Sequence, residues 1–210
     1  MDIPVVKRDT IAARRAAGTP RQRAQRRQLI VEAAVRVIEE SGTAAGLGTV
    51  AERAGLPRPH VYRHFPSRDD LDRAVARHAA QLLTAWIRPS LPAPDTPPEA
   101  AVHRTIGRVL AWAVEHPHLY RFRARLGATH GTLELAAALR PHLPAYVVAS
   151  LAGMVDAGIL WWFDHRDEVD RTQLNDWLAT QVCRVIAESA RIPQIPAGTS
   201  GSGPDGGSTP

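Results

Sequence analysis

Cysteine is almost absent from this chain: Cys183 is the only one among 210 residues, so no disulfide can form within it. Long apolar runs are also missing, and none approaches the roughly 18 residues that a membrane span needs. The first 20 residues have no apolar segment of the kind found in secretory signals. We therefore expect a cytoplasmic protein without membrane contact. Cys183 lies in an apolar helical pattern, which favours a buried packing thiol over a redox sensor.

The sequence also lacks the patterns of strands and of catalytic sites. No segment alternates polar and apolar residues, and no internal repeat is found. There is no Gly-rich phosphate loop, nucleophile elbow or paired-histidine zinc motif. The candidate groups for a catalytic or metal site are His116-Pro117-His118, Asp156 and Asp164-His165, and their spacing matches no such motif. We expect an all-α fold, no enzymatic activity, no metal and no cofactor.

What the chain does have is a basic surplus confined to one part. Residues 1–78 hold 15 Lys and Arg against 9 Asp and Glu, a net charge of +6, whereas the remainder carries −1. Such a bias suits a polyanion such as nucleic acid. A solvated basic surface without a partner would explain the charge equally well.

Two short helices flank a glycine within this basic part. Residues 49–54 should form the first, with Thr49 as its N-cap. Gly55 permits a sharp turn, and the second helix should run from about Arg58 to Phe65, ended by Pro66. This is the arrangement of a helix-turn-helix, whose second helix enters the major groove of DNA. Alone, the pattern has many false positives.

The surrounding residues make the pattern specific. Residues 49–56 read TVAERAGL and residues 61–71 read VYRHFPSRDDL. Together they resemble the signature of the TetR family: a short helix ending in Ala-Gly-Val, a Leu-Tyr-x-His/Tyr-Phe core, and a helix start of the form Ser-Lys-acidic-x-Leu. The match covers about 50 residues. Elsewhere the resemblance is limited to length and an all-helical layout.

The resemblance implies a set of residues facing double-stranded operator DNA. Some would contact base edges and others phosphates, while Val61 and Phe65 would be core. A solvated charge or local packing is the alternative for each. The predicted DNA-binding residues are Thr49, Arg58, Pro59, His60, Tyr62, Arg63, His64 and Arg68.

Two positions depart from the family pattern. Pro57 stands where a Ser or Thr often caps the recognition helix, and proline has no side-chain acceptor, although its fixed φ suits a first helical turn. His60 replaces a small hydroxyl residue, so the base preference does not follow from the family.

The C-terminal part resembles a TetR-type ligand-binding and dimerisation domain. Its last two helices, about Ala145 to Phe163 and Arg171 to Ala190, would pair with those of a second copy in a homodimer. The interface candidates are Val148, Leu151, Val155, Trp177, Cys183 and Ile186, with an intrachain core as the alternative. For an unknown small-molecule effector the candidates are Trp86, Trp112, His116, Tyr120, Arg123, His142 and Trp161. Packing of the aromatic residues is the alternative there.

We thus predict a basic arm over residues 1–20, a three-helix helix-turn-helix domain over 21–68, a helical regulatory and dimerisation domain over 69–192, and a Gly/Ser-rich tail over 193–210. The expected function is a TetR-type transcriptional regulator, a repressor released from DNA by its ligand. The alternative is a helix-turn-helix protein that responds to no ligand or to a partner protein.

Overall fold

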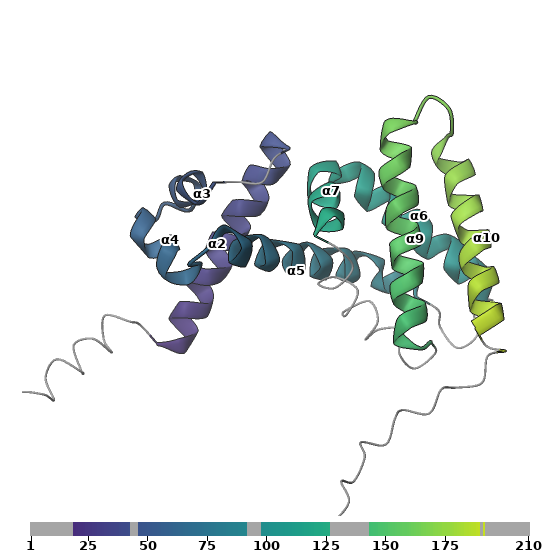
Figure 1. The fold of residues 1–210 in the computed structure, drawn as a ribbon, viewed down its shortest axis with the longest axis horizontal. Helices are drawn as coiled ribbons and strands as arrows, with labels where there is room; N and C mark the ends of the chain where they lie inside the picture. Colours follow the sequence, from purple (N-terminus) through teal and green to yellow (C-terminus); the bar gives the residue numbers. More distant parts are fainter. Residues whose placement is uncertain (1–18, 43–45, 92–97, 127–142, 190, 192–210) are drawn as a thin grey trace, which may run out of the picture.

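Helices alone make up the regular structure of the described residues, which confirms the predicted all-α class. The structure, a computed structural model, describes residues 19–42, 46–91, 98–126, 143–189 and 191. Two groups of helices are joined by one helix that runs from the first group into the second (Figure 1). The predicted arm up to residue 18, a short helix expected over residues 133–139 and the tail lie outside the described residues.

The first group begins with α2 (Pro20–Ser41), whose ends are fixed by local chemistry. At its start, the hydroxyl of Thr19 accepts from the Gln22 amide, and the Gln22 side chain accepts from the Thr19 amide. At its end, Gly42 adopts a left-handed conformation with φ of 69°, which terminates the helix. The buried face of α2 consists of Ile30, Val31, Ala33, Ala34, Val37 and Ile38.

The next two helices form the predicted helix-turn-helix, with one correction. Helix α3 (Leu47–Ala54) has Gly46 as its N-cap, so the expectation that Thr49 caps it is wrong. Leu47 packs against the core and draws the helix start ahead of the hydroxyl residue. Gly55 makes the turn with φ of 64°. Helix α4 (Arg58–His64) follows, and its N-cap Pro57 makes no side-chain bond, as predicted.

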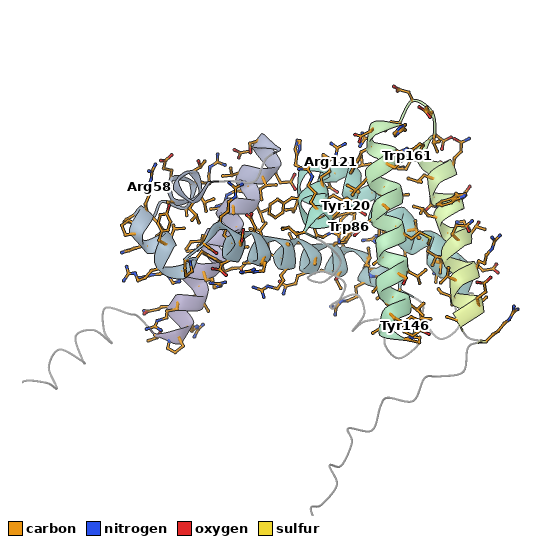
Figure 2. All side chains as sticks on the ribbon, in the orientation of Figure 1. Arg58, Trp86, Tyr120, Arg121, Tyr146 and Trp161 are labelled. Atoms are coloured by element: carbon orange, nitrogen blue, oxygen red, sulfur yellow. The ribbon has the colours of Figure 1, made fainter. Side chains whose placement is uncertain are left out.

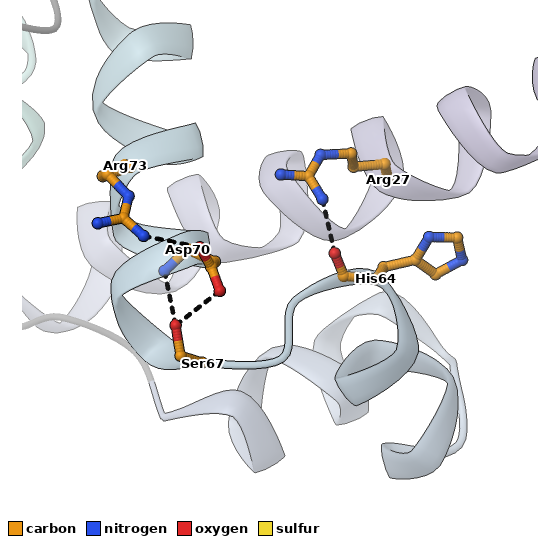
Figure 3. Close-up of polar contacts among 5 residues, drawn as sticks. All are labelled: Arg27, His64, Ser67, Asp70 and Arg73. Atoms are coloured by element: carbon orange, nitrogen blue, oxygen red, sulfur yellow. Dashed lines mark hydrogen bonds and ion pairs between the residues drawn. The ribbon is translucent and has the colours of Figure 1, made fainter.

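Helix α5 (Arg68–Ile87) connects the two groups, and the 3-10 turn η1 (Arg88–Ser90) follows it. Ser67 caps α5 by accepting from the Asp70 amide at 3.1 Å. The Asp70 carboxylate in turn accepts from the Ser67 hydroxyl and from Arg73 (Figure 3). This confirms the cap predicted from the spacing of a serine and an acidic residue.

The second group, as far as the described residues go, is built from helices of the chain's C-terminal part. Pro117 separates α6 (Pro98–Glu115) from α7 (Pro117–Arg125). Helices α9 (Ala145–Asp164) and α10 (Arg171–Ser189) lie side by side at the end of the molecule farthest from α3 and α4 (Figure 1). Gly158 allows their close approach, since a Cβ there would lie 3.1 Å from a Leu178 methyl carbon.

Helix α9 is long and apolar enough to cross a membrane by length and composition, with a mean hydropathy of 1.5 over its window. In the fold, Ile159 and Trp162 are buried in the packing of the helices, and Asp156 forms an ion pair with α7. One side of α9 therefore packs within the protein.

Helices α2, α5 and α7 pack against one another in all three pairs. Small residues along α5, including Ala76, Ala79 and Ala80, are buried at this junction and let its neighbours approach. The first group of helices therefore meets the second through α2 as well as through the covalent connection in α5.

Candidate DNA-binding surface and regulatory domain

Helix α4 has one face in the core and one in solvent. Val61 and Phe65 are fully buried, whereas Tyr62 is 51% exposed. Arg58 lies at the outer edge of the first helix group, far from α9 and α10 (Figure 2). Of the predicted DNA-binding residues, Thr49, Arg58, Pro59, Tyr62, Arg63 and Arg68 are exposed, and His60 and His64 are half-buried. The exposed set offers cationic and hydroxyl donors of the kind that contact phosphates and base edges.

Arg27 of α2 holds α4 in place, a role that the sequence does not reveal. Its guanidinium lies 3.9 Å from the centroid of the Phe65 ring and donates to the carbonyl oxygen of His64 at 2.6 Å (Figure 3). That carbonyl belongs to the last turn of α4, where helix carbonyls lack internal partners. Burial, with the charge of Arg77, lowers the pKa of Arg27. In the sequence, this residue is one of several arginines in a basic segment.

His64 lies among positive charges beside this anchor. Its pKa is lowered, first by partial burial and then by the nearby Arg26, Arg27, Arg63 and His60. A histidine in this setting is held neutral by surroundings that attract an anion. The basic surplus expected from composition is thus gathered around α4 and the first half of α2.

In the second helix group, a buried polar cluster joins α7 to α9. The Asp156 carboxylate oxygen accepts from the Tyr120 hydroxyl at 2.7 Å and from the Arg123 guanidinium. Burial, followed by the charge of Asp156, raises the pKa of Tyr120 well above its ordinary value. Burial alone would lower the pKa of Arg123, but Asp156 and Tyr120 outweigh that effect and raise it. The Nε of Arg123 is buried and has no hydrogen-bond partner.

Four of the predicted effector residues are linked by direct ring contacts. Trp112 is buried and packs near the rings of His116 and Tyr120, so these three and Arg123 form one connected region. Trp86 instead lies at the surface, where its ring N–H donates to the Arg108 carbonyl. Trp161, 46% exposed, stacks on His165. The contacts of Trp86 and Trp161 are thus with other residues, and the effector site stays a prediction. His142 lies outside the described residues.

A groove of about 570 Å³ lies between α9 and α10 near their connection. Trp161 and Trp177, assigned from sequence to the effector site and the interface respectively, line it together with Glu168. Among the other interface candidates, Val155, Cys183 and Ile186 are half-buried. Val148 and Leu151 are already buried within the single chain, so they belong to its own core, a correction to the predicted interface.

His116 links the two helix groups at the break between α6 and α7. Its Nδ1 lies 3.1 Å from a carboxylate oxygen of Glu39 on α2, and its ring lies against Trp112. Beside it, the His118 ring fills the space next to Gly42, where a Cβ would come within 2.8 Å. The C-terminal end of α2 thus packs against the break between α6 and α7.

Comparison with known proteins finds relatives of the first helix group. The model of "Bacterial regulatory proteins, tetR family" matches residues 30–75, the segment that forms the helix-turn-helix. This segment therefore resembles the DNA-binding part of TetR-family regulators. Its TetR-family relatives include the HTH-type transcriptional repressor LfrR of Mycolicibacterium smegmatis, 40% identical over 84 residues that make up 40% of this chain and 43% of the relative. The HTH-type transcriptional activator FasR of the same species is 33% identical over 85 residues, 40% of this chain and 38% of the relative.

The matches to LfrR and FasR thus span less than half of either TetR-family relative. Solved structures extend the likeness to the whole fold. A tetR-family transcriptional regulator from Streptomyces coelicolor superposes with a TM-score of 0.57 at 23% identity, covering 80% of this chain and 83% of its own. The multidrug binding protein EbrR complexed with imidazole gives a TM-score of 0.54 at 21% identity, covering 81% and 97%. The layout of both helix groups is therefore that of TetR-family proteins.

Proposed function

We propose that this protein is a cytoplasmic transcriptional regulator of the TetR family that binds double-stranded operator DNA through α4. The observation that carries the proposal is that α4 has one buried face and one exposed face. Val61 and Phe65 fix its inner face in the core, and Arg58, Tyr62 and Arg63 stand in solvent on the other side. A helix held in this way after a tight turn fits the major groove and presents side chains to base edges.

The charge around α4 supports the same function. His64 lies within the influence of Arg26, Arg27 and Arg63, so the potential here is positive. Phosphate contacts supply most of the affinity of such a surface and make it depend on salt, whereas contacts to bases supply the specificity.

We further propose that the regulator acts as a homodimer joined through α9 and α10. Tyr146, Trp161 and Trp177 are each about half exposed on these two helices, and the groove beside Trp161 and Trp177 is open. Figure 2 shows Tyr146 and Trp161 toward opposite ends of α9. A second copy would cover these rings. A two-fold pair of α4 helices would then address successive major grooves, about 34 Å apart.

A small-molecule effector is proposed to release the protein from DNA. The repressor LfrR and the multidrug binding protein EbrR, seen with imidazole, support a repressor with a ligand, whereas the activator FasR shows that relatives also act in the opposite sense. The region of Tyr120, Arg123 and Asp156 is the proposed anchor for the effector, because it offers buried polar groups between aromatic rings. Release requires that the effector bind more tightly to a form in which the two α4 helices are wrongly spaced.

The test is selection of binding sites from a random duplex pool with the full-length protein. The selected duplex is then titrated by fluorescence anisotropy at several salt concentrations. A partly palindromic site bound about 10³-fold more tightly than scrambled DNA is expected. If no sequence is enriched and binding vanishes as salt rises, the surface makes phosphate contacts only and the proposal fails.

The selected operator can also be used to test how the regulator is controlled. A screen of aromatic amines, carboxylates and fatty acids would seek a compound that lowers the anisotropy of the bound duplex. A compound that acts on wild-type protein but not on a folded Tyr120→Phe variant supports the proposed anchor. If no compound acts, control by a partner protein, the alternative expected from the sequence, gains support.

A further inference from the structure

Arg58, the first residue of α4, is already engaged in the free protein. Its Nη2 lies 3.0 Å from a carboxylate oxygen of Glu52 on α3, and both side chains are about two-thirds exposed. The contact uses one of the five N–H donors of the guanidinium, and Nη2 keeps a second hydrogen. An edge of the guanidinium is thus left for another acceptor.

A glycine makes room for this placement. Gly48 precedes Glu52 by four positions on α3, so the two residues lie on the same face of the helix. A Cβ at Gly48 would lie 3.1 Å from the Cζ of Arg58 and 3.2 Å from its Nη2. The guanidinium therefore rests over the first turn of α3, between the bare backbone of Gly48 and the carboxylate of Glu52.

The pairing changes what Arg58 can bind. A phosphate that approached this guanidinium would also approach the negative charge of Glu52, and the two anions would repel each other. The O6 and N7 atoms of guanine are uncharged acceptors spaced for two parallel donors, and they meet no such repulsion. Glu52 therefore disfavours phosphate contacts by Arg58 while fixing the direction in which its free edge points.

We propose that Glu52 is a specificity-determining residue that reserves Arg58 for a guanine base, with Gly48 as the position that allows it. The inference rests on the proposed DNA-binding function. It assigns to an acidic residue of α3, which is not among the residues expected to face DNA, the task of suppressing non-specific binding.

The experiment measures the ratio of affinities for the selected operator and a scrambled duplex. Glu52→Gln removes the charge but keeps an acceptor, and Glu52→Ala removes both. Asp164→Asn is the matched control, because it raises the net charge equally and breaks the exposed Asp164–Arg121 pair far from α4. Thermal melts of all variants check folding.

For Glu52→Gln we expect the scrambled duplex to bind about five times more tightly, since exposed ion pairs and charge contacts have effects of this size. The operator should gain less, so the ratio falls. Binding to scrambled DNA should also depend more steeply on salt, by about one phosphate contact. Glu52→Ala should lower the ratio further, and Asp164→Asn should leave it unchanged.

Gly48→Ala tests the geometry without altering a charge. Alanine favours the helix, so this variant should melt no lower than wild type. Its ratio of affinities for the operator and for operators in which single G·C pairs are replaced should nevertheless be severalfold lower than that of wild type. An unchanged or higher ratio in the Glu52 variants, with wild type still selecting its operator, overturns the inference alone. Failure of wild type to select any sequence overturns the regulatory proposal and this inference with it.

Discussion

The guanidinium of Arg27 lies 3.9 Å above the Phe65 ring, and one of its N–H groups donates to the carbonyl oxygen of the preceding His64 (Figure 3). A residue of the first helix thereby closes the last turn of the recognition helix. The orientation of α4 depends on this contact as well as on the buried side chain of Val61.

Arg27→Ala should reduce the free energy of unfolding by about 2 kcal/mol, because it removes a cation–π contact and a charged hydrogen bond. Operator affinity should fall together with stability. Arg26→Ala, one position earlier and exposed, is the control: it loses the same charge and should weaken binding in a salt-dependent way with little change in stability. Urea unfolding and anisotropy titrations measure the two effects. Equal stability losses in both variants would contradict the anchoring role.

The buried pair of Arg123 and Asp156 should tolerate no one-sided change. Asp156→Ala leaves a buried, uncompensated guanidinium and should cost about 3–5 kcal/mol of stability. Asp164→Ala breaks the exposed pair with Arg121 and should cost less than about 1 kcal/mol. Tyr120→Phe, which removes one hydrogen bond, should fall between them. Chemical denaturation ranks the three variants, and the same cost for both aspartates would refute the difference in burial.

Comparing alanine variants of Gly42 and Gly55, both at positive φ, distinguishes the cost of backbone strain from the cost of disturbing the contact between the helix groups. Gly55→Ala places a side chain at φ of 64° with open space around it, and should cost about 1 kcal/mol. Gly42→Ala has the same strain at φ of 69° and also meets the His118 ring, so it should cost more. In a His118→Ala background, the difference between the two glycine variants should shrink. If it persists, the ring is not its cause.

DNA binding should strengthen as the pH falls. Burial and the surrounding positive charge lower the pKa of His64 in the free protein below its ordinary value of 6.5. Phosphates beside it would offset that charge and raise the pKa in the complex, so binding takes up a proton. Affinity should rise as the pH falls from the pKa of the complex to the lower pKa of the free protein. Anisotropy titrations between about pH 8 and about pH 5.5 measure it, and His64→Gln should flatten the profile while His165→Gln does not.

The same shift has the opposite effect on folding. Because the folded-state pKa of His64 is lowered, the unfolded chain binds the proton more readily. The contribution of His64 to stability is therefore present above pH 6.5 and is lost as the pH falls toward the folded-state pKa. His64→Gln should reduce the loss of stability under mildly acidic conditions, as thermal melts across this range would show.

Helix bounds could be predicted from the sequence wherever a residue acts through its own backbone. Gly42 and Gly55 end helices because they alone adopt positive φ cheaply, and Pro117 separates two helices because it lacks an amide hydrogen. The prediction that Thr49 caps α3 was wrong because it used only the residue type, whereas the helix starts where Leu47 reaches the core.

Side-chain partnerships could not be predicted in this way. Arg27, Arg58 and Arg123 look alike in the sequence, but one closes a helix, one is paired in solvent and one is buried against a carboxylate. Their roles depend on residues far away in the sequence, as Arg27 does on His64 and Phe65. The same holds for the tryptophans, whose type predicts neither the burial of Trp112 nor the exposure of Trp177.

The mutual packing of α2, α5 and α7 has a mechanical consequence. Three helices that each contact the other two resist sliding past one another more than two helices that meet at a single hinge. The side chains of His116 and His118 lie against the end of α2, so α7 and α2 are in contact there as well as being connected through α5. Helix α4, which Arg27 joins to α2, is then expected to move together with α2, α5 and α7 as one body rather than to pivot on α5 alone.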